Sequence, residues 1–134
     1  MNQTSIKEEV WTTIQTLNRL WTIENRADEL TQYFHKNMVA ISATDRLRLE
    51  GREACVAAWK KFTQAAKIHH WKELDPKIEI FGNNTFAIVT YYFDMSFEMA
   101  GRIIKMGGRD MFALVNEDGK WWAVADQFSP YPQP

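Results

Sequence analysis

The first half of the chain carries apolar residues at the spacing of a helix. Between residues 5 and 23 they recur in steps of three and four, which predicts an amphipathic helix. After a polar break, a second and shorter helix is expected at 27–36, and the same period returns at 52–65. Short β-rich runs at 38–42 and 47–49 separate the second helix from the third. The N-terminal half is therefore expected to be mainly helical.

The second half carries the pattern of strands joined by tight turns. Pro76 interrupts the first run, which indicates an edge strand or a bulge at this point. Asp118-Gly119 is a strong hairpin signal between the last two runs. Helices followed by a strand meander favour an α+β fold, with helices on one face of a mostly antiparallel sheet. The expected strands are 68–74, 77–81, 85–98, 103–115 and 120–128.

The turn of the last hairpin suggests which of its side chains share a face. A three-residue loop ending at Gly119 would pair Arg109 with Gln127. Because side chains alternate along a strand, this register also puts Trp121 on the face of Arg109. Both faces of the hairpin are rich in apolar groups, so the hairpin needs cover on both sides.

The preceding hairpin leaves two registers open. A loop at 99–101 would place Tyr91 on the same face as Arg109. A bulge at Gly107-Gly108 would flip that register and bring Tyr92 inside instead.

Composition narrows the classes of protein that the chain can be. Its 134 residues fit one domain, and 46% hydrophobic and 25% charged residues are ordinary for a globular fold. A net charge of −1 without a basic stripe argues against a nucleic-acid partner. No apolar stretch approaches the roughly 18 residues of a membrane span, so no membrane partner is expected. The start lacks the apolar core of a signal peptide, and the single Cys55 excludes an internal disulfide, so a cytoplasmic location is expected.

Several short motifs then follow one another in a recognisable order. They are Gly-Arg-Glu-Ala at 51–54, Thr-Phe-Ala-Ile-Val-Thr-Tyr at 85–91, Gly-Arg at 108–109, Asp-Gly-Lys-Trp at 118–121 and Gln-x-Ser-Pro at 127–130. In this order the chain resembles the nuclear transport factor 2-like (NTF2-like) superfamily, and within it the SnoaL-like and DUF4440-type domains. The resemblance covers nearly the whole chain. It implies a cone-shaped, cystatin-like fold in which N-terminal helices pack on a strongly bent sheet around a pocket, and a homodimer often formed through the outer sheet face.

The resemblance leaves the function open, because one fold hosts many sites. The superfamily includes ketosteroid isomerases, polyketide cyclases, dehydratases, epoxide hydrolases, transport factors and oligomerisation domains. Three hypotheses follow. The protein binds a small hydrophobic molecule with a carbonyl or anionic group; it is an isomerase, cyclase or dehydratase that transfers protons in the same pocket; or it is a dimerisation module. No cofactor is expected in any of these cases.

Arg109 and Gln127 are the candidate polar anchor of the pocket. If their face lines the cone, they can bind a carboxylate, carbonyl or phosphate of a ligand. Alternatively, a nearby carboxylate neutralises Arg109 and the pair holds the sheet together. Gln127 cannot titrate, unlike the His that related domains often carry there. The chain is rich in tryptophan, and the other expected ligand-binding residues are aromatic: Trp59, Tyr91 and Trp121.

The opposite face of the last hairpin is the expected dimer interface, since the helices can cover only one side of the sheet. Asp110 and Asp126 fall on this face and are expected at the sheet rim or in the interface, which leaves no assigned catalytic base. The adjacent His69 and His70 point to opposite faces of a strand, so no metal site is expected. The expected interface residues are Phe112, Leu114, Trp122, Val124 and Phe128.

Overall fold

The two α-helices form where the apolar period predicts them. In the computed structural model, which describes residues 2–134, α1 spans Gln3–Trp21 and α2 spans Arg52–Ala65. The side chain of Asn2 caps α1 by accepting a hydrogen bond from Ser5 N at 2.9 Å. Among the described residues, neither helix is long and apolar enough to cross a membrane. The buried stripe of α1 follows the predicted steps: Ile6, Val10, Ile14, Leu17, Asn18 and Leu20.

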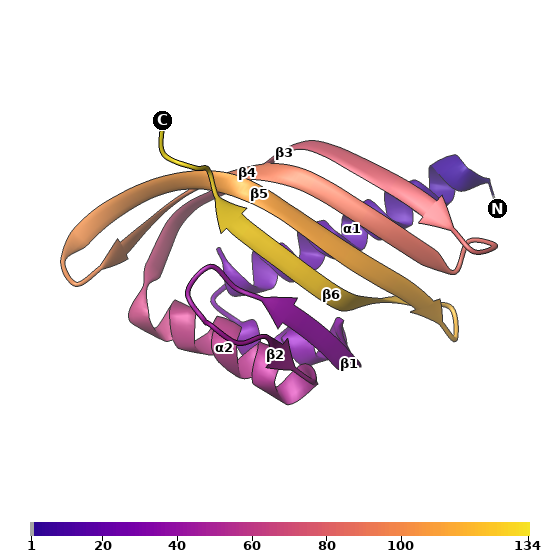
Figure 1. Cartoon of the computed structure of the whole chain (residues 1–134), viewed down its shortest axis with the longest axis horizontal. Helices are drawn as coiled ribbons and strands as arrows, with labels where there is room; N and C mark the ends of the chain where they lie inside the picture. The colour runs from indigo at the N-terminus through magenta and orange to yellow at the C-terminus, as the bar shows by residue number, and fades with distance from the viewer. Residues whose placement is uncertain (1) are drawn as a thin grey trace.

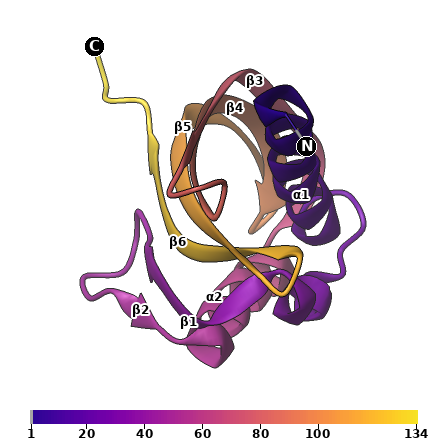
Figure 2. The same ribbon diagram turned by 90° about the vertical axis from the view of Figure 1, so that its right-hand side faces the viewer.

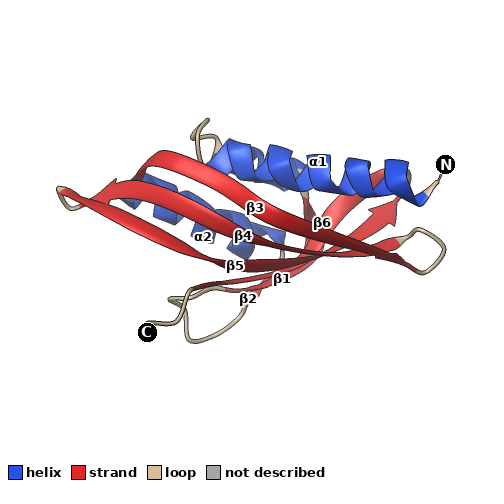
Figure 3. Ribbon diagram, turned by 90° about the horizontal axis from the view of Figure 1, so that it is seen from above, coloured by secondary structure: helices blue, strands red, loops and turns tan. Residues whose placement is uncertain are grey.

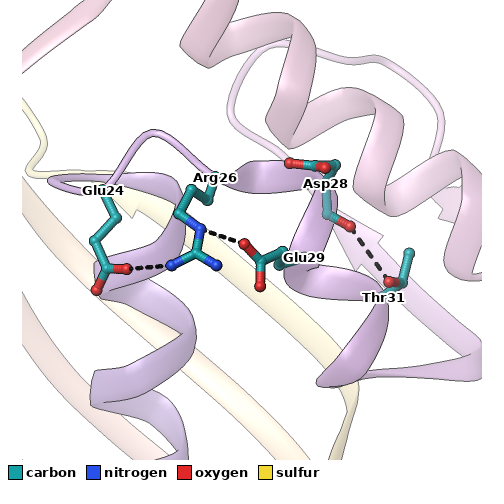
Figure 4. Close-up of polar contacts among 5 residues, drawn as sticks. All are labelled: Glu24, Arg26, Asp28, Glu29 and Thr31. Carbon is teal, nitrogen blue, oxygen red and sulfur yellow. Dashed lines mark hydrogen bonds and ion pairs between the residues drawn. The ribbon is translucent and has the colours of Figure 1, made fainter.

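A short 3-10 helix, η1 (Ala27–Gln32), stands where the sequence predicts a second α-helix at 27–36. The loop that leads into it is held by Arg26, whose guanidinium pairs with Glu24 at 3.2 Å and with Glu29 (Figure 4). The chain is extended soon after η1 instead of continuing as a helix, so the helical prediction for its last residues is wrong.

Six strands form one curved sheet in the order β2-β1-β6-β5-β4-β3 (Figure 1). β1 runs parallel to β6, and the other neighbouring pairs are antiparallel. The predicted α+β class, with N-terminal helices on a strongly bent and mostly antiparallel sheet, is confirmed. The strands are β1 (Phe34–Ile41), β2 (Leu49–Glu50), β3 (Lys67–Phe81), β4 (Phe86–Met99), β5 (Arg102–Glu117) and β6 (Lys120–Pro130).

Two strands differ in extent from the prediction. β1 begins well before residue 38, because Phe34 is fully buried on the covered side of the sheet. β3 is one strand through Pro76 rather than two, with a register shift against β4 between Leu74 and Lys77. β3 is an edge strand, so a proline at this irregularity removes no regular ladder hydrogen bond.

The helices cover only one face of the sheet. Viewed from one end, the sheet curls around α1, and α2 packs below it beside β1 (Figure 2). Seen from above, α1 runs along the sheet near β3 (Figure 3). We call the covered side the concave face and the other side the outer face. The deepest core residues on the concave side are at most 1% exposed and include Val10, Ile14, Leu17, Phe34, Phe112 and Leu114.

Both long hairpins turn on two residues, not on the expected three. Ala100 and Gly101 form one turn, and Asp118 and Gly119 form the other. All four have positive φ angles between 54° and 79°. A type I′ turn requires this backbone at both central positions, and its twist matches that of the strands it joins.

The tighter turn corrects the predicted faces of β5 and β6. It pairs Asn116 with Trp121, so Trp121 points to the concave face instead of sharing the face of Arg109. A further register shift beside Leu114 then brings Gln127 opposite Met111. Arg109 and Gln127 therefore do share a face, but this face is the outer one.

Candidate functional site

The expected anchor residues lie outside the cone. Arg109 and Gln127 are exposed and line a hollow of about 480 Å³ on the outer face, together with Tyr92 and Met111. The Nη2 group of Arg109 donates to Ser129 Oγ at 3.1 Å. The expectation that Arg109 and Gln127 line the concave face is wrong, because the helices cover the opposite face of β5, which carries Asp110 and Phe112.

The three expected aromatic residues are on the concave side. Tyr91 is 2% exposed, and Trp59 and Trp121 are buried as well. The ring of Trp59 packs against Phe34 at 5.2 Å and against Phe128 at 6.1 Å between centroids. The Nε1 donor of Trp121 has no hydrogen-bond partner within residues 2–134. A role in ligand binding stays a prediction for all three.

The expected interface residues divide between the two faces. Phe112 and Leu114 are buried in the core, and Phe128 packs against Trp59 on the concave side. Their assignment to the outer face is wrong, for the same reason as that of Arg109. Trp122 and Val124 are half-buried and belong to the outer face, as expected.

A buried polar cluster occupies the concave face where the sequence predicts none. Tyr91 on β4 lies directly opposite Asp110 on β5. Its hydroxyl donates to Asp110 Oδ2 at 2.6 Å and accepts from Asn18 Nδ2 of α1 at 2.9 Å. Burial, followed by the negative charges of Asp110 and Asp126, raises the pKa of Tyr91 well above its usual value. The phenol is therefore neutral and serves as a hydrogen-bond donor.

Asn18 joins this cluster to the end of α1. Its Oδ1 accepts from Trp21 Nε1 at 3.0 Å, and its Nδ2 also donates to Glu73 Oε2 of β3 at 3.1 Å. Glu73 in turn accepts from Trp71 Nε1 at 2.6 Å. Asn18 is only 1% exposed, and these partners satisfy its amide inside the core.

Asp110 and Asp126 form a buried acid pair. Burial raises the pKa of both carboxyls, although hydrogen bonds from Asp126 and Tyr91 oppose the rise at Asp110. The charge of Asp110 raises the pKa of Asp126 further, to well above its ordinary value. Two carboxyls can hydrogen-bond only when one of them carries a proton. We therefore assign the proton to Asp126, which donates it to Asp110.

The acid pair keeps unused hydrogen-bonding capacity. Within residues 2–134, neither Asp110 Oδ1 nor Asp126 Oδ1 has a donor that fulfils normal hydrogen-bond geometry. Buried carboxyl oxygens without partners are costly, and in native proteins they often mark a functional position. The pair can accept one further hydrogen bond, and neutral Asp126 can donate to a ligand only by giving up its hydrogen bond to Asp110.

The surroundings of the acid pair are apolar and contain no strong nucleophile. Burial raises the pKa of Cys55 to about 11, so its thiol is protonated near neutral pH and unreactive. The ring of Trp11 packs edge-on against Tyr91 at 5.5 Å between centroids. In the part of the chain that the structure describes, no three His, Cys, Asp or Glu side chains are grouped to hold a metal ion.

A surface hollow opens at the end of α1 nearest this cluster. It has a volume of about 420 Å³ and lies among the ends of α1 and α2, the start of β3 and the β4–β5 turn. Trp21 lines this hollow and also donates to Asn18. One run of hydrogen bonds therefore leads from the hollow through Asn18 and Tyr91 to Asp110.

Sequence reasoning missed Asn18, Asp110 and Asp126 as site residues. Strand alternation correctly groups Asp110 and Asp126 with Phe112 and Leu114. Two acids among large apolar residues on one face are a signal of a buried polar site, once that face is known to be covered. Asn18 stands on the apolar stripe of α1, where a polar side chain gives the same signal.

Comparison with known proteins places this geometry in a family and a fold. A family model described as SnoaL-like domain matches residues 14–134. An NTF2-like protein from Cytophaga hutchinsonii aligns with a TM-score of 0.77 at 16% identity, over 98% of this chain and 100% of that one. The association domain of CaMKII from C. elegans aligns with a TM-score of 0.69 at 18% identity, over 94% and 96% of the two chains.

A third neighbour is a structure from Catenulispora acidiphila in complex with S-DNPA. Its TM-score is 0.74 at 15% identity, over 95% of this chain and 94% of that one. No curated protein sequence matches the chain. At these identities the structural likenesses establish the NTF2-like fold and nothing about activity.

Proposed function

The chain belongs to the SnoaL-like domain family, and from that premise we propose that it binds a small hydrophobic molecule on its concave face. The ligand would carry a carbonyl or hydroxyl oxygen, which Tyr91 and the acid pair of Asp110 and Asp126 would hold. One neighbour of the same fold is a complex with S-DNPA, so this fold can accommodate a bound compound.

The observation that carries the proposal is the acid pair itself. Two buried carboxyls lie next to a buried phenol, and two of the carboxyl oxygens lack donors among the described residues. A ligand hydroxyl can donate to such an oxygen, and a ligand carbonyl can accept from neutral Asp126 if it replaces Asp110 as the acceptor. A purely structural cluster would be expected to satisfy its own polar atoms.

The same groups argue against an anionic ligand at this position. The charges of Asp110 and Glu73 would repel a carboxylate or phosphate, and Arg109 on the outer face cannot reach it. We therefore narrow the expected ligand to an uncharged molecule. Its apolar part would pack against the aromatic side chains around Tyr91 and Trp59.

The test is a thermal-shift and calorimetric screen of hydrophobic ketones and alcohols, each beside its carboxylic-acid analogue. A ligand found in this way should bind roughly tenfold more weakly to Tyr91→Phe and to Asp126→Asn, because each change removes one hydrogen bond in the apolar interior. Arg109→Ala is the matched control and should bind like the wild type. Preferential binding of the acids, with a loss in Arg109→Ala only, would contradict the proposal.

Proton transfer is the second candidate activity, favoured by an acid pair that holds one proton. A ketone carbonyl that replaces Asp110 as the acceptor for Tyr91 and neutral Asp126 is polarised by both, and ionised Asp110 is then available to accept a proton from the neighbouring carbon. NMR would detect this as deuterium exchange at that carbon of a bound ketone. Exchange should disappear in Asp110→Asn while binding persists. Binding without any exchange would show that the protein binds the ketone but does not transfer its proton.

Self-association through the outer face is the third part of the proposal. The outer face of β5 and β6 is apolar and uncovered by either helix, and a structural neighbour is an association domain. Trp122→Glu should therefore convert a homodimer to monomers in sedimentation experiments. A wild-type protein that is monomeric at micromolar concentration would exclude the dimer. The half-buried or exposed apolar residues of this surface are Met111, Ala113, Val115, Trp122 and Val124.

A further inference from the structure

The tip of the β4–β5 hairpin is an apolar and basic projection. We define the hairpin tip as residues 100–105, all of which are exposed. It reaches beyond the body of the protein, past the end of α2 (Figure 1). Ile103 is 58% exposed and Ile104 is 37% exposed. Arg102 and Lys105 flank them directly in the sequence.

Neither isoleucine belongs to the buried core of the protein. In the β4–β5 register, Ile104 lies opposite Phe97, whose side chain is buried in the core, whereas Ile104 itself is 37% exposed. Ile103 lies opposite Glu98 and is more exposed still. Adjacent strand residues point to opposite faces, so the hairpin tip presents an isoleucine on each side. Large apolar side chains in such a position are typical of a surface that contacts something else.

The charge around the hairpin tip is positive. Arg102 and Lys105 form no ion pair within residues 2–134, and Lys67 of β3 adds a third cation nearby. Two carboxylates lie nearby: Glu98, which lies opposite Lys67 and contacts His69 at 3.3 Å, and Asp94, which lines the same surface hollow as Lys105. The free positive charge therefore stands beside the exposed isoleucines.

We propose that the hairpin tip docks the protein on an anionic phospholipid surface. Ile103 and Ile104 would enter the boundary between headgroups and acyl chains, while Arg102 and Lys105 pair with lipid phosphates. The long side chains of these cations can reach the headgroups while their apolar stems remain buried. Docking of this kind needs no membrane span, so it is compatible with helices that cannot cross a bilayer.

A second copy of the chain fits this surface less well. Two hairpin tips related by a twofold axis would bring Arg102 and Lys105 of both copies together, and like charges in contact are repulsive. An anionic bilayer supplies the complementary charge instead.

Docking also bears on the class of ligand, and this step rests on the proposed function. Ala100 and Gly101 line the 420 Å³ hollow that Trp21 shares with the polar cluster. Ile23, at 58% exposed, lines the same hollow. A docked hairpin tip would hold this opening close to the bilayer. The ligand of the concave site would then be a lipophilic molecule that partitions into membranes.

The test is co-sedimentation of the full chain with phospholipid vesicles. Two compositions are compared: phosphatidylcholine alone, and an equal mixture of phosphatidylcholine and phosphatidylglycerol. The wild type should bind the mixed vesicles and be released by high salt. Ile103→Glu with Ile104→Glu should weaken this binding at least tenfold. The pair Ile103→Ser with Ile104→Ser should weaken it as well, and circular dichroism verifies that both variants fold.

The matched control is Phe81→Glu, which changes an apolar residue of similar exposure, 51%, in another turn region of the same sheet. It should bind vesicles like the wild type. Equal binding by the wild type and both hairpin-tip variants would overturn the proposal. So would a hairpin-tip variant that changes only the sedimentation of the lipid-free protein, because the occupant would then be a second copy.

Failure of docking and failure of the proposed function are distinguishable. Tyr91→Phe should lose affinity for a soluble ketone ligand but still bind mixed vesicles. The variant Ile103→Glu with Ile104→Glu should keep its affinity for the soluble ketone but bind mixed vesicles weakly. If Tyr91→Phe releases the protein from vesicles, the docking assignment is wrong even where the concave site binds its ligand.

Discussion

The two faces of β5 place neighbouring residues in very different surroundings. Arg109 is exposed on the outer face and, among residues 2–134, has only Ser129 as a side-chain partner. Asp110, the next residue, is buried, and its carboxyl contacts Tyr91 and Asp126. An isolated charge costs little free energy of folding at residue 109, where solvent is near. It costs much more at residue 110, because desolvation disfavours the charged form. The chemistry that a strand can perform thus depends on which face is covered, rather than on which polar residues it carries.

The same contrast separates the tryptophans of β6. Trp121 points into the core, and Trp122 lies on the outer face between Lys120, at 4.2 Å from its ring centroid, and Arg52, at 5.5 Å. The inner ring contributes apolar packing, and the outer ring contributes cation–π contacts that are weak where solvent is near. Amino-acid composition alone does not distinguish these two tryptophans.

Truncation of an apolar residue gives the sharpest test of this contrast. Phe112→Ala should lower the free energy of unfolding by about 3–5 kcal/mol, because it leaves a cavity in the core. Met111→Ala, one residue away on the outer face, should change it by at most about 1 kcal/mol in the monomer. Chemical denaturation measures both values. Similar losses in the two variants would mean that both faces are covered.

The acid pair predicts a pH dependence that Asp126→Asn removes. Asp126 has a raised pKa in the folded protein, so it holds its proton where the unfolded chain has lost it. Its contribution to stability is complete at pH values below the unfolded pKa, near 4, and declines as the pH rises through the folded pKa.

Relative to Asp126→Asn, the wild type should therefore lose about 1.4 kcal/mol per pH unit above roughly pH 4, until the folded pKa is reached. Denaturation curves of both proteins at several pH values give this difference. A constant difference across the series would mean that Asp126 is ionised in the fold. Asp94→Asn is the matched control, because it removes a carboxyl from an exposed position of the outer face instead of a buried one.

Tyr91→Phe should cost less, about 1–2 kcal/mol. It removes the hydroxyl that bonds Asp110 and Asn18 but keeps the ring that packs on Trp11. Thermal unfolding measures the loss. Tyr92→Phe is the matched control on the outer face, where the hydroxyl is accessible to solvent, and should be close to neutral.

Arg109→Ala should have the smallest effect, within about 0.5 kcal/mol, because Arg109 is exposed and has no carboxylate partner in the part of the chain described. Urea denaturation is sufficient to measure it. A loss of several kcal/mol would show that Arg109 holds the sheet together, which is the structural alternative derived from the sequence.

Much of the fold could be predicted because its signals are local. The apolar period of α2 marks its bounds at Arg52 and Ala65, and Asp118-Gly119 marks the last hairpin. The candidate site could not be predicted as well. Its groups come from five elements, α1 and β3 to β6, so their approach depends on how strands pair and where α1 lies. The predicted loop of the last hairpin was one residue too long, and this alone assigned Trp121 to the wrong face of the sheet.

The sequence by itself determined the α+β class, the main helices and hairpins, and which side chains of each strand share a face. These follow from periods of two and 3.6 residues that each segment carries within itself. Only the tertiary structure decided which face of the sheet is covered, because α1 and α2 can pack on one side alone. That choice buries Asp110 and Asp126, exposes Arg109 and Gln127, and so moves the candidate site from a basic anchor to a buried acid pair.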